Sequence, residues 1–329
     1  MSTSKKSPKR DTRSKNSSIF AIFEQNLLYV SLYAFVFIVT INVYMSRSLQ
    51  NTTQSSSLEF SATQTVLAAE DSLSFDEPML RDVAFSYPIL SAQGVIVKDL
   101  ESGKILFEKT PDVPLLPAST VKLMTALVVV DTIDPEEIIT VPSLVVEGQK
   151  MGLVSGEQMT VKSLTEGLLV YSANDAAEVL AQTYDGGREA FVEAMNSKAR
   201  EIGLQNTLFS NPTGLDGVTQ VTTARDLENL AEYAIGISDI AEIVRQKSIV
   251  IQSVDGEHIH RLTNTNLLLG KVEGVMGIKT GWTENARENL VTYVDRDGKK
   301  IITVILGSQD RFGESEELIE WIYDTYIWK

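Results

Sequence analysis

A serine and a lysine three residues apart, Ser119 and Lys122, lie in the apolar segment PASTVKLMTALVVV. If this segment is a helix that begins at Ser119, the two side chains lie on the same side of it, one turn apart. Burial and a second cation both favour the neutral form of a lysine, so Lys122 would deprotonate Ser119. The helix N-terminus would add a positive dipole end where the attacking oxygen develops charge. The pair therefore indicates a nucleophilic serine that needs no histidine.

The Ser-x-x-Lys spacing alone is a weak signal. A chain of this length contains about one such pair by chance, and Ser2 and Lys5 form a second one here. The structural alternative is that Ser119 caps the helix while the ammonium group of Lys122 reaches water.

Two further polar motifs follow in order along the chain. Ser172 and Asn174 lie in a short break between two helical segments, and Lys279, Thr280 and Gly281 lie on an apolar segment that is typical of a strand. Ser-x-Asn is common by chance, whereas Lys-Thr-Gly is rare. The ordered set supplies a nucleophile and its base, a second hydroxyl for proton transfer and a second cation, and this order is the strong signal.

Strand and helix patterns surround these motifs. Residues 94–109 and 289–308 each read as a hairpin, with turns at Ser102-Gly103 and Asp297-Gly298. Apolar periodicity predicts helices over 119–130, 161–170, 175–184, 188–202 and 223–235, and a last helix over 311–329. Strands at both ends with helices between them predict an α+β fold, with one mixed sheet whose terminal strands pair and a helical insertion.

The composition argues against several classes of function. The formal net charge is −15, although residues 1–18 hold six basic residues and one acidic residue, and an acidic body repels the phosphate backbone of nucleic acid. The chain has no cysteine, which excludes disulfides, thiol catalysis and cysteine-ligated zinc. His258 and His260 alternate after an Asp-Gly turn, so we expect an ordinary half-exposed strand with both rings on one face.

An apolar, charge-free run over residues 27–45 is about long enough to cross a bilayer. Signal peptides have shorter apolar segments and a nearby small-residue cleavage site, so a retained anchor is favoured, with a cleaved signal peptide as the alternative. The basic tail places the N-terminus in the cytoplasm. We therefore expect a cytoplasmic tail over 1–18, a transmembrane anchor over 19–46, a flexible extracytoplasmic stalk over 47–85 and a folded domain over 86–329.

The three motifs resemble those of the penicillin-recognising serine enzymes. The resemblance favours one branch, the low-molecular-weight penicillin-binding proteins that are serine D-alanyl-D-alanine carboxypeptidases. It rests on PASTVKLMTAL, MGLVSGEQMTVKSLTEGLL, SANDAAEVLA, NPTGLD, TTARDLENLA and NTNLLLGKVEGVMGIKTGWT, and runs from about residue 93 to the C-terminus. It implies a β-lactamase/transpeptidase-like fold with an antiparallel sheet of about five strands and flanking helices. It also implies action on peptidoglycan stem pentapeptides, inhibition by β-lactams and a place at the bacterial cell membrane.

The resemblance implies a role for the residues of the first two motifs. Ser119 would attack the carbonyl of the penultimate D-alanine, with Lys122 as general base. Ser172 would relay the proton to the leaving D-alanine, and Asn174 would hold the peptide. Water would then hydrolyse the acyl-enzyme.

The strand motif would bind the substrate. By resemblance, Lys279 and Thr280 would bind its terminal carboxylate, and Lys279 would help to keep the first lysine neutral. The backbone N–H groups of Ser119 and Trp282 would form the oxyanion hole, and Gly281 would let the substrate approach the strand closely. No metal or organic cofactor is implied.

The chain departs from the family pattern at two places. Where the family usually has Ala-Gly after its Lys-Thr-Gly, this chain has Ala286-Arg287-Glu288-Asn289, so we expect a differently shaped loop beside the site. Ala173 stands where glycine is frequent, with little effect expected.

Three alternatives stay open. A class A β-lactamase would carry Ser-Asp-Asn and a Glu-x-x-Leu-Asn loop, but residues 201–205 are the nearest match and read as the end of a helix. A D,D-endopeptidase that cuts cross-links would use the same residues as a carboxypeptidase. A catalytically inactive binder of cell-wall peptides is the third, and the presence of all three polar motifs weighs against it.

Overall fold

The computed structural model describes residues 77–82, 85–217 and 219–329. The expected tail and anchor and most of the expected stalk lie outside these residues, so the proposed division of the chain stays a prediction. Among the residues described, no helix combines the length and apolarity needed to cross a bilayer.

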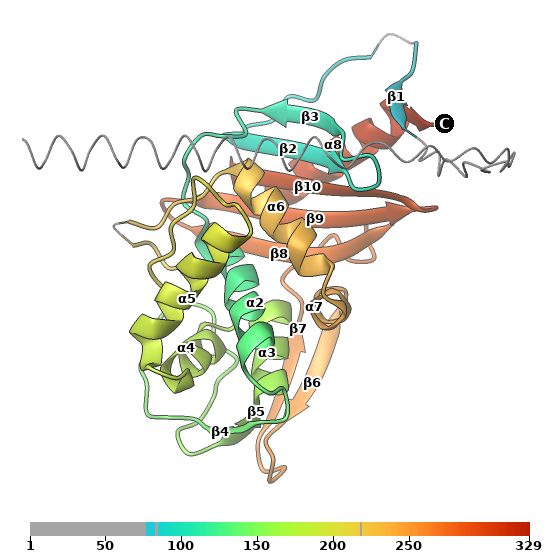
Figure 1. The fold of residues 1–329 in the computed structure, drawn as a ribbon. Coiled ribbons are helices and arrows are strands. Elements are labelled where there is room, and N and C mark those ends of the chain that lie inside the picture. Colours follow the sequence, from blue (N-terminus) through green and yellow to red (C-terminus); the bar gives the residue numbers. More distant parts are fainter. Residues whose placement is uncertain (1–76, 83–84, 218) are drawn as a thin grey trace, which may run out of the picture. The chain divides into compact units, whose positions relative to one another are not determined.

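A five-stranded sheet has the order β3-β2-β10-β9-β8 (Figure 1). Every pair of neighbouring strands in it is antiparallel, so the mixed sheet expected from the order of elements is wrong and the antiparallel sheet implied by the resemblance is confirmed. Its strands are β2 (Gly94–Asp99), β3 (Ile105–Lys109), β8 (Val275–Thr283), β9 (Arg287–Arg296) and β10 (Lys299–Ser308). Both predicted hairpins are confirmed, as β2–β3 and β9–β10. Strand β2, from the start of the fold, pairs with β10 near its end. The expectation that the terminal strands pair is therefore also confirmed.

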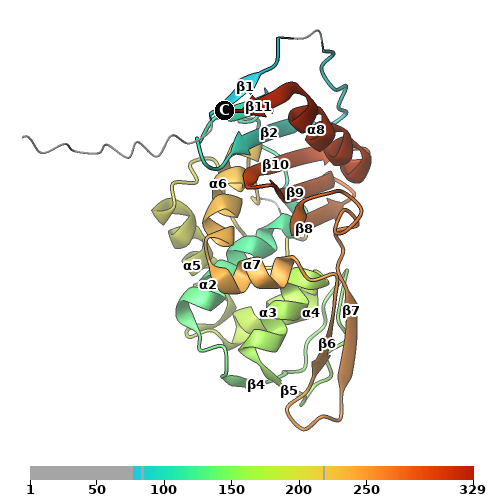
Figure 2. The ribbon, with the colours of Figure 1, turned by 90° about the vertical axis from the view of Figure 1, so that its right-hand side faces the viewer.

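Helices cover both faces of the sheet. Helix α6 (Ala224–Ile235) packs against β2 and β10 on one face, and α8 (Arg311–Thr325) packs against β9 and β10 on the other (Figure 2). The apolar side chains form one core cluster shared with the helical region and a second between the sheet and α8. Because both faces are covered, β2 and β10 are almost continuously buried, which explains their uninterrupted apolar runs.

The helical insertion lies on one side of the sheet, together with two small two-stranded sheets (Figure 1). It consists of η1 (Ala118–Val121), α2 (Lys122–Thr132), α3 (Val161–Val170), α4 (Asn174–Thr183), α5 (Gly187–Glu201) and α7 (Ser238–Val244). The two-stranded sheets are β4 (Ile138–Thr140) with β5 (Gln158–Thr160), and the hairpin of β6 (Ser248–Gln252) with β7 (Ile259–Thr263). The expected helices are thus confirmed to within a few residues, and α7, β4 and β5 were not anticipated.

The helix expected to begin at Ser119 begins later. Residues 118–121 form a 3₁₀ turn, and the α-helix starts at Lys122. The N-cap of neither segment makes a side-chain hydrogen bond, so Ser119 is not a helix cap. The turn begins at Ala118, which has a φ of 48°, and the serine hydroxyl is left available for other partners.

The chain end also differs from expectation. The last helix stops at Thr325, and β11 (Tyr326–Trp328) pairs with β1 (Pro78–Leu80). Two hydrogen bonds fix β11: Tyr326 Oη donates to the Leu106 carbonyl at 2.6 Å, and Trp328 Nε1 donates to Asp99 Oδ1 at 2.8 Å. These long-range partners override the helical pattern, and part of the segment expected to be a stalk is paired as a strand.

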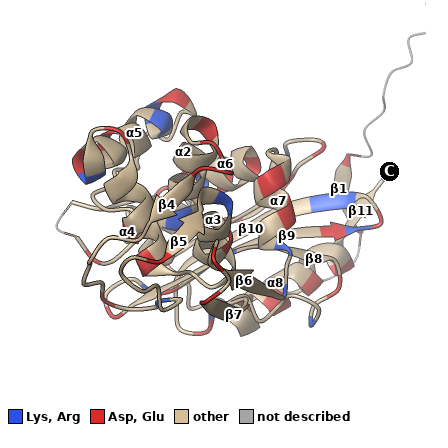
Figure 3. Ribbon diagram, turned by 90° about the horizontal axis from the view of Figure 1, so that it is seen from below, with Lys and Arg blue, Asp and Glu red and all other residues tan. Residues whose placement is uncertain are grey.

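Acidic positions lie along α5, α6 and α7 (Figure 3). Each of these helices carries an acidic residue in its first turn, where the helix dipole favours negative charge. Their distribution agrees with the acidic body expected from the sequence.

Candidate active site

Ser119 and Lys122 meet at the junction of η1 and α2. Lys122 Nζ lies 2.9 Å from Ser119 Oγ and also donates a hydrogen bond to the backbone carbonyl of Thr213. The lysine side chain is fully buried. A buried amine in contact with a hydroxyl is the arrangement that the sequence predicted for a base and its nucleophile.

The loop 211–215 supplies the carbonyl beneath Lys122. Asn211 Oδ1 accepts hydrogen bonds from the backbone of Thr213 at 3.2 Å and of Gly214 at 2.7 Å, which fixes the turn. Gly214 has a φ of 85°, and a Cβ there would lie 2.0 Å from the carbonyl oxygen of Ala118. Only glycine therefore fits this contact. The motif NPTGLD contributed to the resemblance, but nothing in the sequence indicated that Thr213 would contact the lysine.

Burial is the main cause of the altered acidity of both lysines. It lowers the pKa of Lys122 well below its usual value, and the charge of Lys279 lowers it further, against a smaller opposite effect of Glu178 and Asp175. Burial also lowers the pKa of Lys279 to about 7, with a contribution from the positive charge of Arg311. The dry surroundings and the second cation, both expected from the sequence, thus act on Lys122 in the predicted direction.

Strand β8 passes directly beside the serine. A Cβ on Gly281 would lie 3.1 Å from the backbone nitrogen of Ser119, so the absent side chain allows this approach. Thr280 Oγ1 lies 2.8 Å from the hydroxyl of Thr265, and Lys279 Nζ donates to the Thr280 carbonyl at 3.1 Å. Trp282, the next residue, is 61% exposed.

The second motif faces the same space from the other side. Ser172 has a φ of 62° in the break between α3 and α4, a strained conformation of the kind found at functional sites. Asn174 begins α4, and its Nδ2 donates to the Glu147 carbonyl at 2.7 Å. Its Oδ1 is buried without a hydrogen-bond partner among the residues described, which leaves an acceptor for a ligand.

These elements enclose a cavity of about 650 Å³. The predicted site residues that line it are Ser119, Ser172, Asn174, Thr280, Gly281 and Trp282. The two lysines lie beneath its surface and are 0% and 1% exposed. The structure therefore brings together all three motifs, which extend from Ser119 to Gly281 in the sequence.

Arg311 also lines the cavity, and sequence reasoning missed it. Its Nη1 donates to the Gly281 carbonyl at 2.9 Å, and its Nε is buried without a partner among the residues described. Arg311 is the first residue of α8. The sequence placed it in the last helix but gave no indication that it would reach the cavity. Its place in the cavity depends on how α8 docks against the end of β8.

The profile of peptidase family S11, D-alanyl-D-alanine carboxypeptidase, matches residues 82–310. This range contains all three motifs and most of the described fold. The chain belongs to this family. The resemblance inferred from the motifs is therefore confirmed.

Relatives in the S11 family cover a similar part of the chain. D-alanyl-D-alanine carboxypeptidase DacC of Escherichia coli is 35% identical over 71% of this chain and 62% of its own length. The D-alanyl-D-alanine endopeptidase of Pseudomonas aeruginosa is 31% identical over 71% of this chain and 77% of its own length. The chain thus spans less than two thirds of the length of DacC.

The fold is also that of solved penicillin-recognising enzymes. The crystal structure of the Streptomyces K15 DD-transpeptidase matches with a TM-score of 0.68 at 27% identity, and the match covers 73% of this chain and 100% of that one. The α+β transpeptidase-like fold with its five-stranded sheet is therefore confirmed, while the expected membrane helix lies outside the residues described.

The departure of this S11 chain after Lys-Thr-Gly has a structural account. Arg287 has a φ of 58°, a conformation that glycine adopts readily, and the family usually has glycine there. Asn289 Nδ2 donates to the carbonyls of Leu116 and Pro117, at 2.9 and 3.0 Å. Glu288 Oε2 accepts the Arg311 backbone N–H at 2.9 Å. The substituted residues thus brace the segment before the serine and the start of α8.

Proposed function

We propose that this chain is a serine-type D-alanyl-D-alanine carboxypeptidase that acts on peptidoglycan stem peptides through an acyl-enzyme on Ser119. One observation carries the proposal: the hydroxyl of Ser119 lies 2.9 Å from the buried amine of Lys122, whose pKa is lowered well below its usual value by burial and by Lys279. Membership of the S11 family supports the same activity.

The hydrogen bonds of Lys122 fit a neutral amine that acts as a base. The Thr213 carbonyl can only accept, so one N–H of Lys122 points at it. The lone pair of a neutral amine is then available for the Ser119 hydroxyl. In the proposed acylation, Lys122 takes the hydroxyl proton while the serine oxygen bonds to the carbonyl carbon of the penultimate D-alanine.

Cationic groups around β8 would bind the terminal carboxylate of the substrate. Lys279, with a pKa of about 7, is partly protonated at neutral pH, and a bound carboxylate would favour its charged form. Thr280 offers a hydroxyl on the cavity wall, and Arg311 offers a second cation there. The backbone N–H groups of Ser119 and Trp282 are the proposed oxyanion hole.

Ser172 and Asn174 would act on the leaving side and on the peptide. As the carbon–nitrogen bond breaks, Ser172 would pass a proton to the amine of the departing D-alanine. Asn174, with its unpartnered buried Oδ1, would accept a hydrogen bond from the bound peptide. Water would then attack the ester, releasing a shortened peptide with a new carboxylate and restoring the Ser119 hydroxyl.

The test is release of D-alanine from a stem pentapeptide by the purified chain. We expect free D-alanine from the wild type, and none from Ser119→Ala at equal protein concentration. A wild type that binds the pentapeptide but releases no D-alanine would instead support the inactive-binder alternative.

A second activity has one specific observation in its favour. A relative named as a D-alanyl-D-alanine endopeptidase, from Pseudomonas aeruginosa, is 31% identical over 71% of this chain. Parallel incubations with a stem pentapeptide and with cross-linked muropeptides would separate the two activities. We expect faster loss of D-alanine than of cross-links, and the opposite order would assign the chain as a D,D-endopeptidase.

We also propose that β-lactams acylate Ser119 and are released slowly. In this fold Glu201, the nearest match to the β-lactamase glutamate, is the last residue of α5 and does not line the cavity. Stable labelling by a fluorescent penicillin is the expected outcome, and rapid turnover of the label would support a β-lactamase.

The proposed location is the bacterial cell membrane, with the N-terminus in the cytoplasm and the enzyme outside. It rests on the apolar run over 27–45 and the basic residues before it. Cell fractionation and protease digestion of intact spheroplasts would test it. Recovery of the full chain in the soluble fraction would contradict the proposal.

A further inference from the structure

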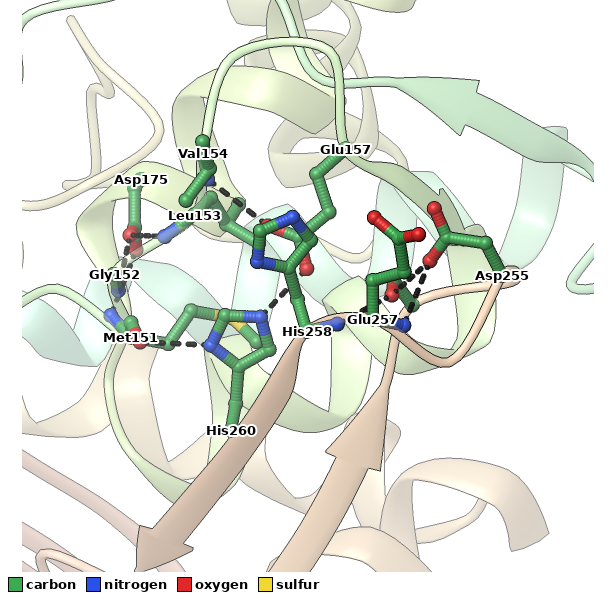
Figure 4. Close-up of polar contacts among 11 residues, drawn as sticks. Met151, Gly152, Leu153, Val154, Glu157, Asp175, Asp255, Glu257, His258 and His260 are labelled. Carbon is green, nitrogen blue, oxygen red and sulfur yellow. Dashed lines mark hydrogen bonds and ion pairs between the residues drawn. The ribbon is translucent and has the colours of Figure 1, made fainter.

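A buried histidine–glutamate pair lies behind the loop that forms one wall of the cavity (Figure 4). His260 Nε2 lies 2.7 Å from Glu157 Oε1, and His260 Nδ1 lies 3.0 Å from the Met151 carbonyl. Glu157 Oε2 accepts the backbone N–H of Val154 at 2.9 Å. His260 and Glu157 are 8% and 4% exposed. The expectation of an ordinary half-exposed strand is therefore wrong for His260, because the loop covers its ring, while His258 is partly exposed.

The contacts of His260 require an extra proton. A backbone carbonyl only accepts, so Nδ1 must carry a hydrogen to bond Met151. In a neutral imidazole, Nε2 is then also an acceptor, and it would face the acceptor oxygens of Glu157. Both bonds form only if the ring is doubly protonated or the carboxyl group keeps its proton. The pair therefore holds one shared proton.

The loop that contacts this pair, residues 147–153, is also hydrogen-bonded to the start of α4, where the second motif ends at Asn174. Asp175 accepts the backbone N–H groups of Met151, Gly152 and Leu153, at 3.0, 2.9 and 3.1 Å. The preceding residue, Asn174, begins α4. The segment 147–153 is thus attached at one end to His260 and along its length to the start of α4.

The other end of this segment orients the amide of Asn174. Its side-chain Nδ2 donates to the Glu147 carbonyl, and its backbone N–H donates to the Gln149 carbonyl, both at 2.7 Å. Gly148 lies so close that a Cβ there would be 2.7 Å from Nδ2. These three loop residues line the cavity together with Asn174, so a shift of the loop would move the amide within it.

We propose that Glu157 and His260 are positioning residues, whose shared proton fixes the loop 147–153 and so holds the Asn174 amide in its productive orientation. The inference rests on the proposed function, because the Asn174 amide binds the peptide only if Ser119 is acylated in this cavity. Neither residue of the pair lines the cavity, so both act through the loop.

Other titratable groups lie around the pair. Figure 4 places Asp175 on the α4 side, and Asp255, Glu257 and His258 at the β6–β7 turn. Asp175 binds the loop backbone, and Asp255 binds Ser253 and the backbone of Glu257. The ring nitrogens of His260 and the Glu157 carboxylate bond to each other, to Met151 and to Val154. Among the groups drawn, the proton-dependent contact is therefore that of the pair itself.

Three variants and one control separate positioning from simple stability. Glu157→Gln can accept from Val154 and donate an amide hydrogen to Nε2, so it keeps every contact with a neutral ring. His260→Leu removes both ring bonds. The double variant Glu157→Leu with His260→Leu replaces the buried pair by apolar side chains, a change that often preserves stability. His258→Leu is the matched control on the same hairpin.

The measurement is the second-order rate constant for acylation by a fluorescent penicillin, taken well below each melting temperature. We expect a loss of about 10- to 100-fold in His260→Leu and in the double variant, because misplaced groups remote from the chemistry cost rates of this order. We expect rates near the wild type for Glu157→Gln and His258→Leu.

A folded double variant that acylates at the wild-type rate would overturn the inference, as would a Glu157→Gln variant that loses as much rate as His260→Leu. A lowered melting temperature without a lowered rate would also overturn it, because it assigns the pair to stability alone. Failure of the proposed function is distinguishable: in that case the wild type itself does not react.

Discussion

Lys122 and Lys279 are buried lysines, and their environment favours the neutral amine over the ammonium ion. Burial is the largest cause of the lowered pKa of each, and removing a charge from water costs free energy unless the group is paired or neutralised. No carboxylate bonds either amine among the residues described; their contacts are Ser119 and the backbone carbonyls of Thr213 and Thr280. Burial of these two amines therefore lowers the stability of the fold, and the same burial favours the neutral amine that a general base requires.

The first prediction concerns the pH dependence of stability. The pKa of Lys279 is about 7 in the folded chain against 10.5 as its ordinary value. Between these two pH values the unfolded chain binds more protons, so the free energy of unfolding should rise with pH, by about 1.4 kcal/mol per pH unit for this group. Urea unfolding at pH 7.5 to 9.5 would measure the slope. Lys279→Met should have a smaller slope, and equal slopes would contradict the lowered pKa.

The second prediction concerns the glycine beneath the serine turn. Gly214→Ala would place a Cβ only 2.0 Å from the Ala118 carbonyl oxygen, far closer than two such atoms can approach. We expect acylation by penicillin to fall by about 100-fold, since the turn that carries Ser119 must move. Gly203→Ala is the matched control, because Gly203 also has a positive φ, of 79°, with nothing within 4 Å of the added Cβ. It should lose about 1 kcal/mol of stability and keep its acylation rate.

At the scale of elements, the turn between β8 and β9 connects the strand that carries the Lys-Thr-Gly motif to its neighbour. Thr283 pairs with Arg287 across this turn, and Asn289 and Glu288 tie the start of β9 to the segment before η1 and to α8. The turn thus couples three elements that line or support the cavity. A left-handed residue at its end is the point of strain.

The third prediction follows from that strain. Arg287 is exposed and has a φ of 58°, a conformation that costs a non-glycine residue about 1–2 kcal/mol. Arg287→Gly should therefore raise the free energy of unfolding by up to about 1 kcal/mol, after the entropy cost of glycine, and raise the melting temperature by a few degrees. Thermal unfolding checks this. A lower melting temperature would mean that the arginine side chain makes a larger contribution than the strain costs.

Local patterns predicted most of the elements. The turns at Ser102-Gly103 and Asp297-Gly298 and the apolar periodicity of α3 or α6 are short-range signals, and they located hairpins and helices to within a few residues. The 3₁₀ turn at the serine and the strand β11 depend instead on contacts with Gly214 and with β1. Such contacts join residues far apart in the sequence, so no local pattern contains them.

The residues of the candidate site also fall into those that the sequence predicted and those that only the folded structure shows. Its three motifs were predicted because their residue types and order are themselves the signal. Thr213, Arg311 and the pair of Glu157 with His260 were not, because each acts through a contact that exists only after folding. A carbonyl oxygen has no sequence signature, and a single arginine or histidine has a weak one.

At the scale of the whole molecule, the sheet and the helical insertion each contribute one side of the cavity. Strand β8 and the start of α8 belong to the sheet layer, whereas η1 and the break before α4 belong to the insertion. Because β2 and β10 pair within the sheet, the strands from the start and the end of the folded region belong to one layer, with β8 at its edge beside the cavity. The geometry of the site therefore depends on the packing of both layers.

The account as a whole rests on Ser119 becoming acylated, with Lys122 as its base. Mass spectrometry of the chain after incubation with benzylpenicillin, followed by peptide mapping, measures this most directly. We predict one covalent penicillin per chain, on the peptide that contains Ser119, with none in Ser119→Ala and a strongly slowed reaction in Lys122→Met. A wild type without an adduct, or an adduct on another residue, would contradict the account.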